Sequence, residues 1–132
     1  MKITIDFDSI LDRVYSESAW HAAYAPGVAL LTPDNARMLE MRIEDGFTHL
    51  RSRLSGYLDS WNFNRFLEKG NITIELVLAP AMDSMEATLR DIIVQALASY
   101  ALKSFYGEET SCYGTSWRMY CARLMILLAR EA

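Results

Sequence analysis

Three carboxylates near the N-terminus are the first residues whose type and spacing could support chemistry. Asp6 and Asp8 follow an alternating apolar stretch, and Asp12 lies four residues beyond Asp8. Clustered carboxylates occur in calcium-binding loops, which also need a glycine at the sixth position for a sharp turn. Counted from Asp6, that position holds Leu11. The sequence therefore excludes a calcium loop of this type.

The string Asp6-Phe7-Asp8 after an apolar strand resembles the nucleophile turn of haloacid-dehalogenase-type phosphatases. The resemblance implies that the first carboxylate attacks phosphorus, while the second transfers the leaving-group proton beside a magnesium ion. That family also uses a downstream lysine and a further acidic pair, carried at the ends of strands in a larger parallel sheet. The sequence shows no such partners at strand ends and no pattern for such a sheet. We therefore expect Asp6 on the solvent face of a strand and Asp8 or Ser9 at a helix N-cap. A metal-dependent phosphatase is kept as an alternative function.

Histidine and cysteine, which are common in catalytic sites, are few in this chain. His21 lies in an apolar stretch and is expected to be partly buried, whereas His49 lies off the apolar face of its helix and is expected in solvent. Cys112 and Cys121 are nine residues apart, which matches no zinc or redox motif, so two reduced thiols are expected. No nucleophile motif or glycine-rich phosphate loop is present in the sequence. We predict a protein that is not an enzyme, without catalytic, cofactor-binding or metal-binding residues.

Three aromatic residues near a polar segment form a candidate partner-binding site. Tyr106, Tyr113 and Trp117 lie in and beside residues 107–116, and amphipathic rings of this kind anchor protein partners. The alternative is that these rings pack beneath the loop as ordinary core residues. The seven methionines are expected mostly to fill the core, because their spacings match the apolar faces of helices.

The composition limits both the partners and the compartment. The chain has 132 residues, 52% hydrophobic and 23% charged, so residues 1–132 are expected to form a single domain. The net charge is -4 and the basic residues are scattered, which argues against direct binding to nucleic acid. No uninterrupted apolar run approaches about eighteen residues, so no membrane span is expected. The N-terminus turns acidic before any signal-peptide pattern develops, which indicates a cytoplasmic protein.

Apolar periodicity predicts two strands and four helices. Residues 2–7 and 71–78 alternate between apolar and polar positions, as half-buried strands do. Helices are expected from residue 8 or 9 to about 24, from 33 to 61, from about 83 to 107, and from 115 or 116 onward. The third is apolar over a wide arc and is expected to be central; the last should bury Trp117, Tyr120, Cys121, Leu124 and Leu128. The predicted fold is mainly α with a small β component (α+β), a four-helix cluster with two short strands in the order β-α-α-β-α-α.

The second helix raises a question of length. It begins with Thr32 as N-cap and Pro33 at the first position, and its apolar stripe continues to Trp61. An unbroken helix over 33–61 would be about 43 Å long, whereas a globule of this size is about 35 Å across. Either Gly46 or Gly56 marks a bend, or the helix projects and another molecule covers its end.

The layout as a whole is similar to small helical neck and tail-completion proteins (head-tail connector-like) of tailed bacteriophages and prophages. The similar parts are the N-terminal strand leading into helices, an apolar central helix of the type seen over residues 89–100, and a closing helix from Tyr113 through Trp117 to Leu128. The resemblance implies a virion structural role, in which the chain is one subunit of a ring and contacts neighbouring virion proteins. It implies no catalytic residue.

Two functions are therefore expected ahead of the phosphatase. The first is a structural or assembly protein, a prophage-type neck or tail component that associates with itself and with virion partners in a bacterial cytoplasm or in the virion. The second is a small helical adaptor that binds partners through Tyr106, Tyr113 and Trp117.

Overall fold

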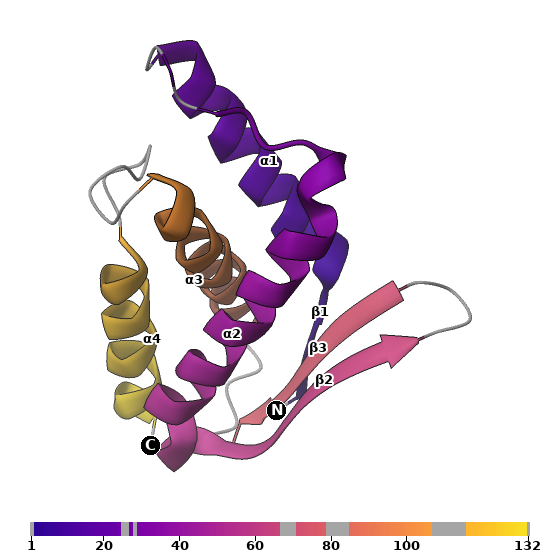
Figure 1. Ribbon diagram of the computed structural model, residues 1–132. Helices are drawn as coiled ribbons and strands as arrows, with labels where there is room; N and C mark the ends of the chain where they lie inside the picture. Colours follow the sequence, from indigo (N-terminus) through magenta and orange to yellow (C-terminus); the bar gives the residue numbers. More distant parts are fainter. Residues whose placement is uncertain are drawn as a thin grey trace.

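A three-stranded antiparallel sheet and four helices make up the part of the chain that the computed structural model describes: residues 2–24, 27, 29–66, 71–78, 85–106 and 116–131. Figure 1 shows the helices packed beside one another, with the sheet along one edge of the molecule. The elements are β1 (Lys2–Asp6), α1 (Phe7–Tyr24), η1 (Pro33–Asn35), α2 (Ala36–Leu54), η2 (Ser55–Tyr57), β2 (Leu58–Phe66), β3 (Asn71–Leu78), α3 (Glu86–Tyr106) and α4 (Trp117–Glu131). The predicted α+β class and the four helices are confirmed.

The sheet has the strand order β1-β3-β2, and both pairs are antiparallel. Ile3 pairs with Leu76 and Ile5 with Ile74, and all four side chains are buried. The alternation in β1 places Lys2 and the other even-numbered residues in solvent, as predicted. The two predicted strands therefore pair with each other within one chain.

The third strand, β2, occupies residues that the sequence pattern had assigned to a long helix. Helix α2 ends at Leu54, and η2 contains Gly56, so a break at this glycine resolves the question of length. Beyond it, residues 61–64 read Trp-Asn-Phe-Asn, an alternation that suits a strand. Pairing with β3 then satisfies the backbone groups of β2. The element order is β-α-α-β-β-α-α, and no projecting helix remains to argue for a covering molecule.

The starts of α1 and α2 lie close to the predicted ones. The Thr32 N–H donates to Asn35 Oδ1 at 3.0 Å, and Pro33 occupies the first position of η1, which leads directly into α2. Helix α1 begins at Phe7 at the end of β1, so Asp8 lies in the first helical turn and does not act as the N-cap. In that turn the negative charge of Asp8 still interacts favourably with the positive end of the helix dipole.

Helix α3 is the central element, as its wide apolar arc predicts. It packs against α1, α2 and α4, and Figure 1 shows it between those helices. Its fully buried positions are Leu89, Ala96, Leu97, Ala98 and Ala101. The approach of α2 to α3 depends on Gly46, where an added Cβ would lie 2.7 Å from Tyr100 Cδ1 and 2.9 Å from Cγ. A glycine at this point lets the two helices pack closely.

Candidate functional site

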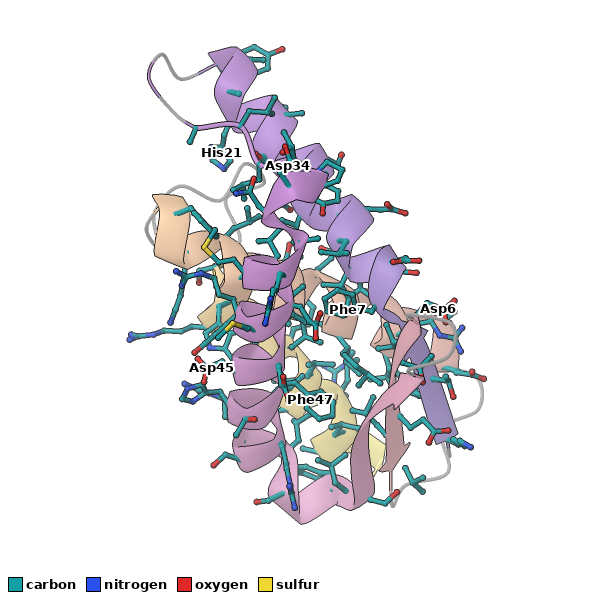
Figure 2. All side chains as sticks on the ribbon, turned by 45° about the vertical axis from the view of Figure 1, so that its right-hand side comes forward. Asp6, Phe7, His21, Asp34, Asp45 and Phe47 are labelled. Carbon is teal, nitrogen blue, oxygen red and sulfur yellow. The ribbon has the colours of Figure 1, made fainter. Side chains whose placement is uncertain are left out.

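The two carboxylates of the Asp-x-Asp string lie on the surface. Asp6 ends β1, as Figure 2 shows, Asp8 lies one residue into α1, and both side chains are exposed. Within the described ranges, no group of three or more histidines, cysteines, aspartates or glutamates is arranged to hold a metal ion. The fold also places the string at the edge of a small antiparallel sheet, whereas the phosphatase resemblance requires a larger parallel one.

A second polar cluster is buried within the C-terminal half of α1. Glu17, Ser18 and His21 are all buried there. The Leu31 N–H donates to Ser18 Oγ at 2.7 Å, and Arg13 Nε lies 3.4 Å from Glu17 Oε1. The first contact attaches the segment before η1 to α1, whereas the second joins two residues one helical turn apart within α1. Burial lowers the pKa of His21 below its ordinary value, which favours the neutral imidazole at neutral pH.

The lowered pKa of His21 predicts a loss of stability in mild acid. As the pH falls below about 6.5, the unfolded chain takes up a proton on His21 that the folded protein resists, so the free energy of unfolding decreases. The decrease continues until the pH passes the pKa of the folded state. Urea unfolding between pH 7.5 and pH 5 should show this slope in the native protein and in His49→Gln, which changes the exposed histidine. His21→Gln should flatten it, and an equal slope in all three proteins would contradict the assignment.

Cys121 is a core residue without nucleophilic character. It is buried and forms no disulfide, as predicted, while Cys112 lies outside the described residues. Burial raises the pKa of the Cys121 thiol to about 11, with Arg53 acting weakly in the opposite direction. Because the thiolate is the reactive form, this thiol is inert at neutral pH.

A shallow groove of about 310 Å³ lies on the surface between α2 and α3. It is lined by Met38, Met41, Arg42, Asp45, Tyr100 and Lys103. Asp45, labelled in Figure 2, lies on the outer side of α2. The sequence pattern did not predict this groove because Tyr100 lies on the wide apolar arc of α3, and the residues of that arc were expected to pack at the centre of the fold.

The polar groups of this groove interact with one another. The Tyr100 hydroxyl donates to the Asp45 carboxylate, His49 Nε2 lies 3.8 Å from Asp45 Oδ1, and Lys103 Nζ lies 4.6 Å from the centre of the Tyr100 ring. Burial first, and then the Asp45 hydrogen bond, raise the pKa of Tyr100 to about 12. At neutral pH this hydroxyl therefore stays protonated and is unsuited to act as a general base. The exposed position of His49 agrees with the sequence-based expectation.

Helix α4 has two apolar faces. The inner face is as predicted, with Trp117, Tyr120, Cys121, Leu124 and Leu128 all buried. On the opposite face, Met119 is 52% exposed and Ile126 56%, and Met125, at the border between the two faces, is 40% exposed. The expectation that methionines mostly fill the core is wrong for Met119 and Met125, and also for Met38 and Met41, which are exposed on α2.

The exposed face of α4 has the spacing of a helix-packing seam. Met119, Ala122, Ile126 and Ala129 follow one another at intervals of three, four and three residues and are exposed; they are called the α4 outer stripe below. That spacing is the a/d pattern by which one helix packs along another. Arg118, Arg123 and Arg130 flank the stripe and are exposed. The periodicity of α4 was visible in the sequence, but its second apolar face was not recognised.

Of the three aromatic residues proposed as a partner site, the structure describes the side chain of Trp117. Trp117 is 5% exposed and packs edge-on against Tyr100, with ring centroids 5.0 Å apart, so it belongs to the core. Tyr106 is the last residue of α3, but its side chain is outside the described part, as is the whole of Tyr113. Binding of a partner by this trio stays a prediction.

Comparison with known proteins returns no match among family models, curated proteins or solved structures. Across the described residues, none of the helices combines the length and the apolar character needed to cross a membrane.

Proposed function

We propose that this protein is a non-enzymatic assembly protein that associates with copies of itself and with partner proteins through the α4 outer stripe. The supporting observation is the apolar outer face of α4, where Met119 and Ile126 are more than half exposed and lie one heptad apart. Isolated apolar residues on a surface are ordinary, but a row of them at helix-packing spacing marks an interaction surface.

Association at this stripe has a physical basis in the burial of apolar area. Removing a Met or Ile side chain from water contributes roughly 1.5–3 kcal/mol when burial is complete. Met119 and Ile126 are only half covered in the isolated chain, so a partner helix would complete their burial. A single contact between two helices buries less surface than the ~1,200 Å² that a stable interface buries in total, so each contact is expected to be weak.

The resemblance to phage neck and tail-completion proteins supplies the biological setting of this proposal. A weak contact repeated around a ring is reinforced by closure, because the last subunit binds through two interfaces at once. The protein would then be one subunit of a virion neck or tail component, made in the cytoplasm of a bacterial host. Its partners would be copies of itself and neighbouring virion proteins, without direct contact to nucleic acid or membrane.

The adaptor function is less well supported because Trp117 packs in the core. An adaptor using the trio of Tyr106, Tyr113 and Trp117 would have to withdraw this side chain from its contact with Tyr100. The α4 outer stripe requires no such rearrangement, since its side chains already lie on the surface.

Light scattering coupled to size-exclusion chromatography tests the proposed function. Over loading concentrations from about 1 μM to about 1 mM, the native protein should show a rising mass, as expected for weak contacts. Ile126→Glu should remain monomeric, because it places a charge at the centre of the stripe. Met41→Glu is the matched control, since Met41 is exposed on a helix and gains the same charge. A native protein that stays monomeric throughout, or equal effects of both changes, would reject the proposal.

A further inference from the structure

We infer that the α4 outer stripe docks on the outer face of α1 in a second copy of this chain. This inference rests on the proposed function and identifies the surface that receives the stripe. The outer face of α1 consists of the exposed residues Asp8, Asp12, Ser16, Ala19 and Ala23, with Trp20 at its border. Asp12, Ser16, Ala19 and Ala23 follow one another at intervals of four, three and four, so both surfaces show the alternation of three and four residues that is typical of packed helices.

Charge complementarity selects α1 as the receiving surface. The stripe is flanked by Arg123 and Arg130, whereas α1 presents Asp8 and Asp12. Two α4 helices packed against each other would bring arginines of like charge together, which disfavours a contact between identical faces. An α4 helix on α1 brings opposite charges together and excludes that repulsion.

The sizes of the side chains are complementary in an antiparallel arrangement. If Met119 lies opposite Ala23, the spacing brings Ile126 to Ser16 and Arg130 to the neighbourhood of Asp12. Large side chains on α4 then meet small ones on α1, as close packing requires. The two helix dipoles also run in opposite directions in this arrangement.

The position of the two surfaces determines what kind of assembly forms. Helix α3 packs against both α1 and α4, and Figure 1 shows these two helices on different sides of it. Each copy therefore offers one donor surface on α4 and one acceptor surface on α1, which do not meet within the same chain. Such head-to-tail contacts produce a ring when the rotation closes and a filament when it does not.

A mixing experiment with two blocked variants tests this inference. The α1-blocked variant carries Asp12→Lys and Ala19→Lys, both at exposed positions, and keeps the α4 outer stripe intact. The α4-blocked variant carries Ile126→Glu and keeps the outer face of α1 intact. Circular dichroism and thermal unfolding confirm that both are folded. At concentrations where the native protein associates, sedimentation equilibrium should show each variant alone as a monomer and an equimolar mixture as monomers in equilibrium with a one-to-one dimer and nothing larger.

A charge exchange across the same contact adds a second readout. Adding Arg130→Glu to the α1-blocked variant should weaken the mixed dimer about tenfold, equivalent to about 1.4 kcal/mol. Adding Asp12→Lys to the α4-blocked variant as well should restore most of that loss. No restoration would show that Arg130 and Asp12 do not face each other, which would overturn the antiparallel arrangement.

The outcomes separate this inference from the proposed function. If the α1-blocked variant alone still forms the native assembly while Ile126→Glu abolishes it, α4 is an interface but α1 is not its receptor, and only this inference fails. If the native protein never associates, the proposed function fails as well. A dimer of the α1-blocked variant with itself would show a symmetric contact between α4 helices, which also overturns the inference.

Discussion

Leu124→Ala is expected to lower the free energy of unfolding by about 2–5 kcal/mol, the largest loss among the substitutions considered. Leu124 is fully buried on the inner face of α4, so its truncation removes apolar contacts and leaves a cavity in the core. Urea unfolding monitored by circular dichroism, at a concentration where the protein is monomeric, measures this loss.

Ile126→Ala is the matched control on the same helix, two residues away. Its side chain is mostly exposed, so the free energy of unfolding of the monomer should change by no more than about 0.5 kcal/mol. The two faces of α4 would then have separate roles, stability for the inner and association for the outer. Equal losses for Leu124→Ala and Ile126→Ala would show that the outer face is buried within the monomer.

Gly46→Ala should destabilise the protein by about 1–3 kcal/mol, although alanine is normally the better helix former. The new methyl group would lie within 3.0 Å of two ring carbons of Tyr100, which is shorter than a normal contact. These atoms lie at the base of the ring, so α2 and α3 must move apart or the Tyr100 side chain must rotate away from Asp45. Thermal or urea unfolding measures the net effect.

Gly56→Ala provides the control for this prediction, because an added Cβ at that position meets no atom within 4 Å. It should leave the stability unchanged or raise it by up to about 1 kcal/mol. Introducing Gly46→Ala into a Tyr100→Ala background should cost less than in the native protein, since the ring atoms are gone. If Gly46→Ala stabilises the native protein, the close approach of α2 and α3 is incorrect.

Most of the helical core could be predicted from the sequence because the apolar spacing there is compatible with only one type of secondary structure. The inner face of α4, from Trp117 to Leu128, and the alternation of β1 were both identified residue by residue. The start of α2 was predicted from Thr32 and Pro33 because capping depends on neighbouring residues alone. Local signals of this kind do not require knowledge of the tertiary structure.

The end of α2 could not be predicted as well, because the apolar pattern is compatible with two structures there. Tyr57 and Trp61 continue the helical spacing, while residues 61–64 also alternate as a strand does. These residues form a strand rather than a helix because they pair with β3 along the edge that β1 does not occupy. The strand therefore depends on a partner that follows it in the sequence, and a reading based on local periodicity favours the helix.

The candidate interaction surface was missed for a related physical reason. An apolar residue at helical spacing indicates that a helix packs against something, but it does not say whether the other surface belongs to the same chain. Met119 was expected in the core together with the other methionines, and Ile126 was assigned to neither face of its helix. Only the position of α4 at the outside of the helical cluster shows that both side chains face solvent. Tyr100 illustrates the opposite case, since part of an expected core residue lines a surface groove.

Nuclear magnetic resonance of the methionine methyl groups tests most directly whether the protein associates through the outer face of α4. Met119 lies on the α4 outer stripe, whereas Met38 and Met41 lie at the groove on α2. As the concentration of the native protein rises, the Met119 methyl signal should shift or broaden while the signals of Met38 and Met41 stay in place. Changes confined to Met38 and Met41, or no change in any of the three signals, would contradict association through α4.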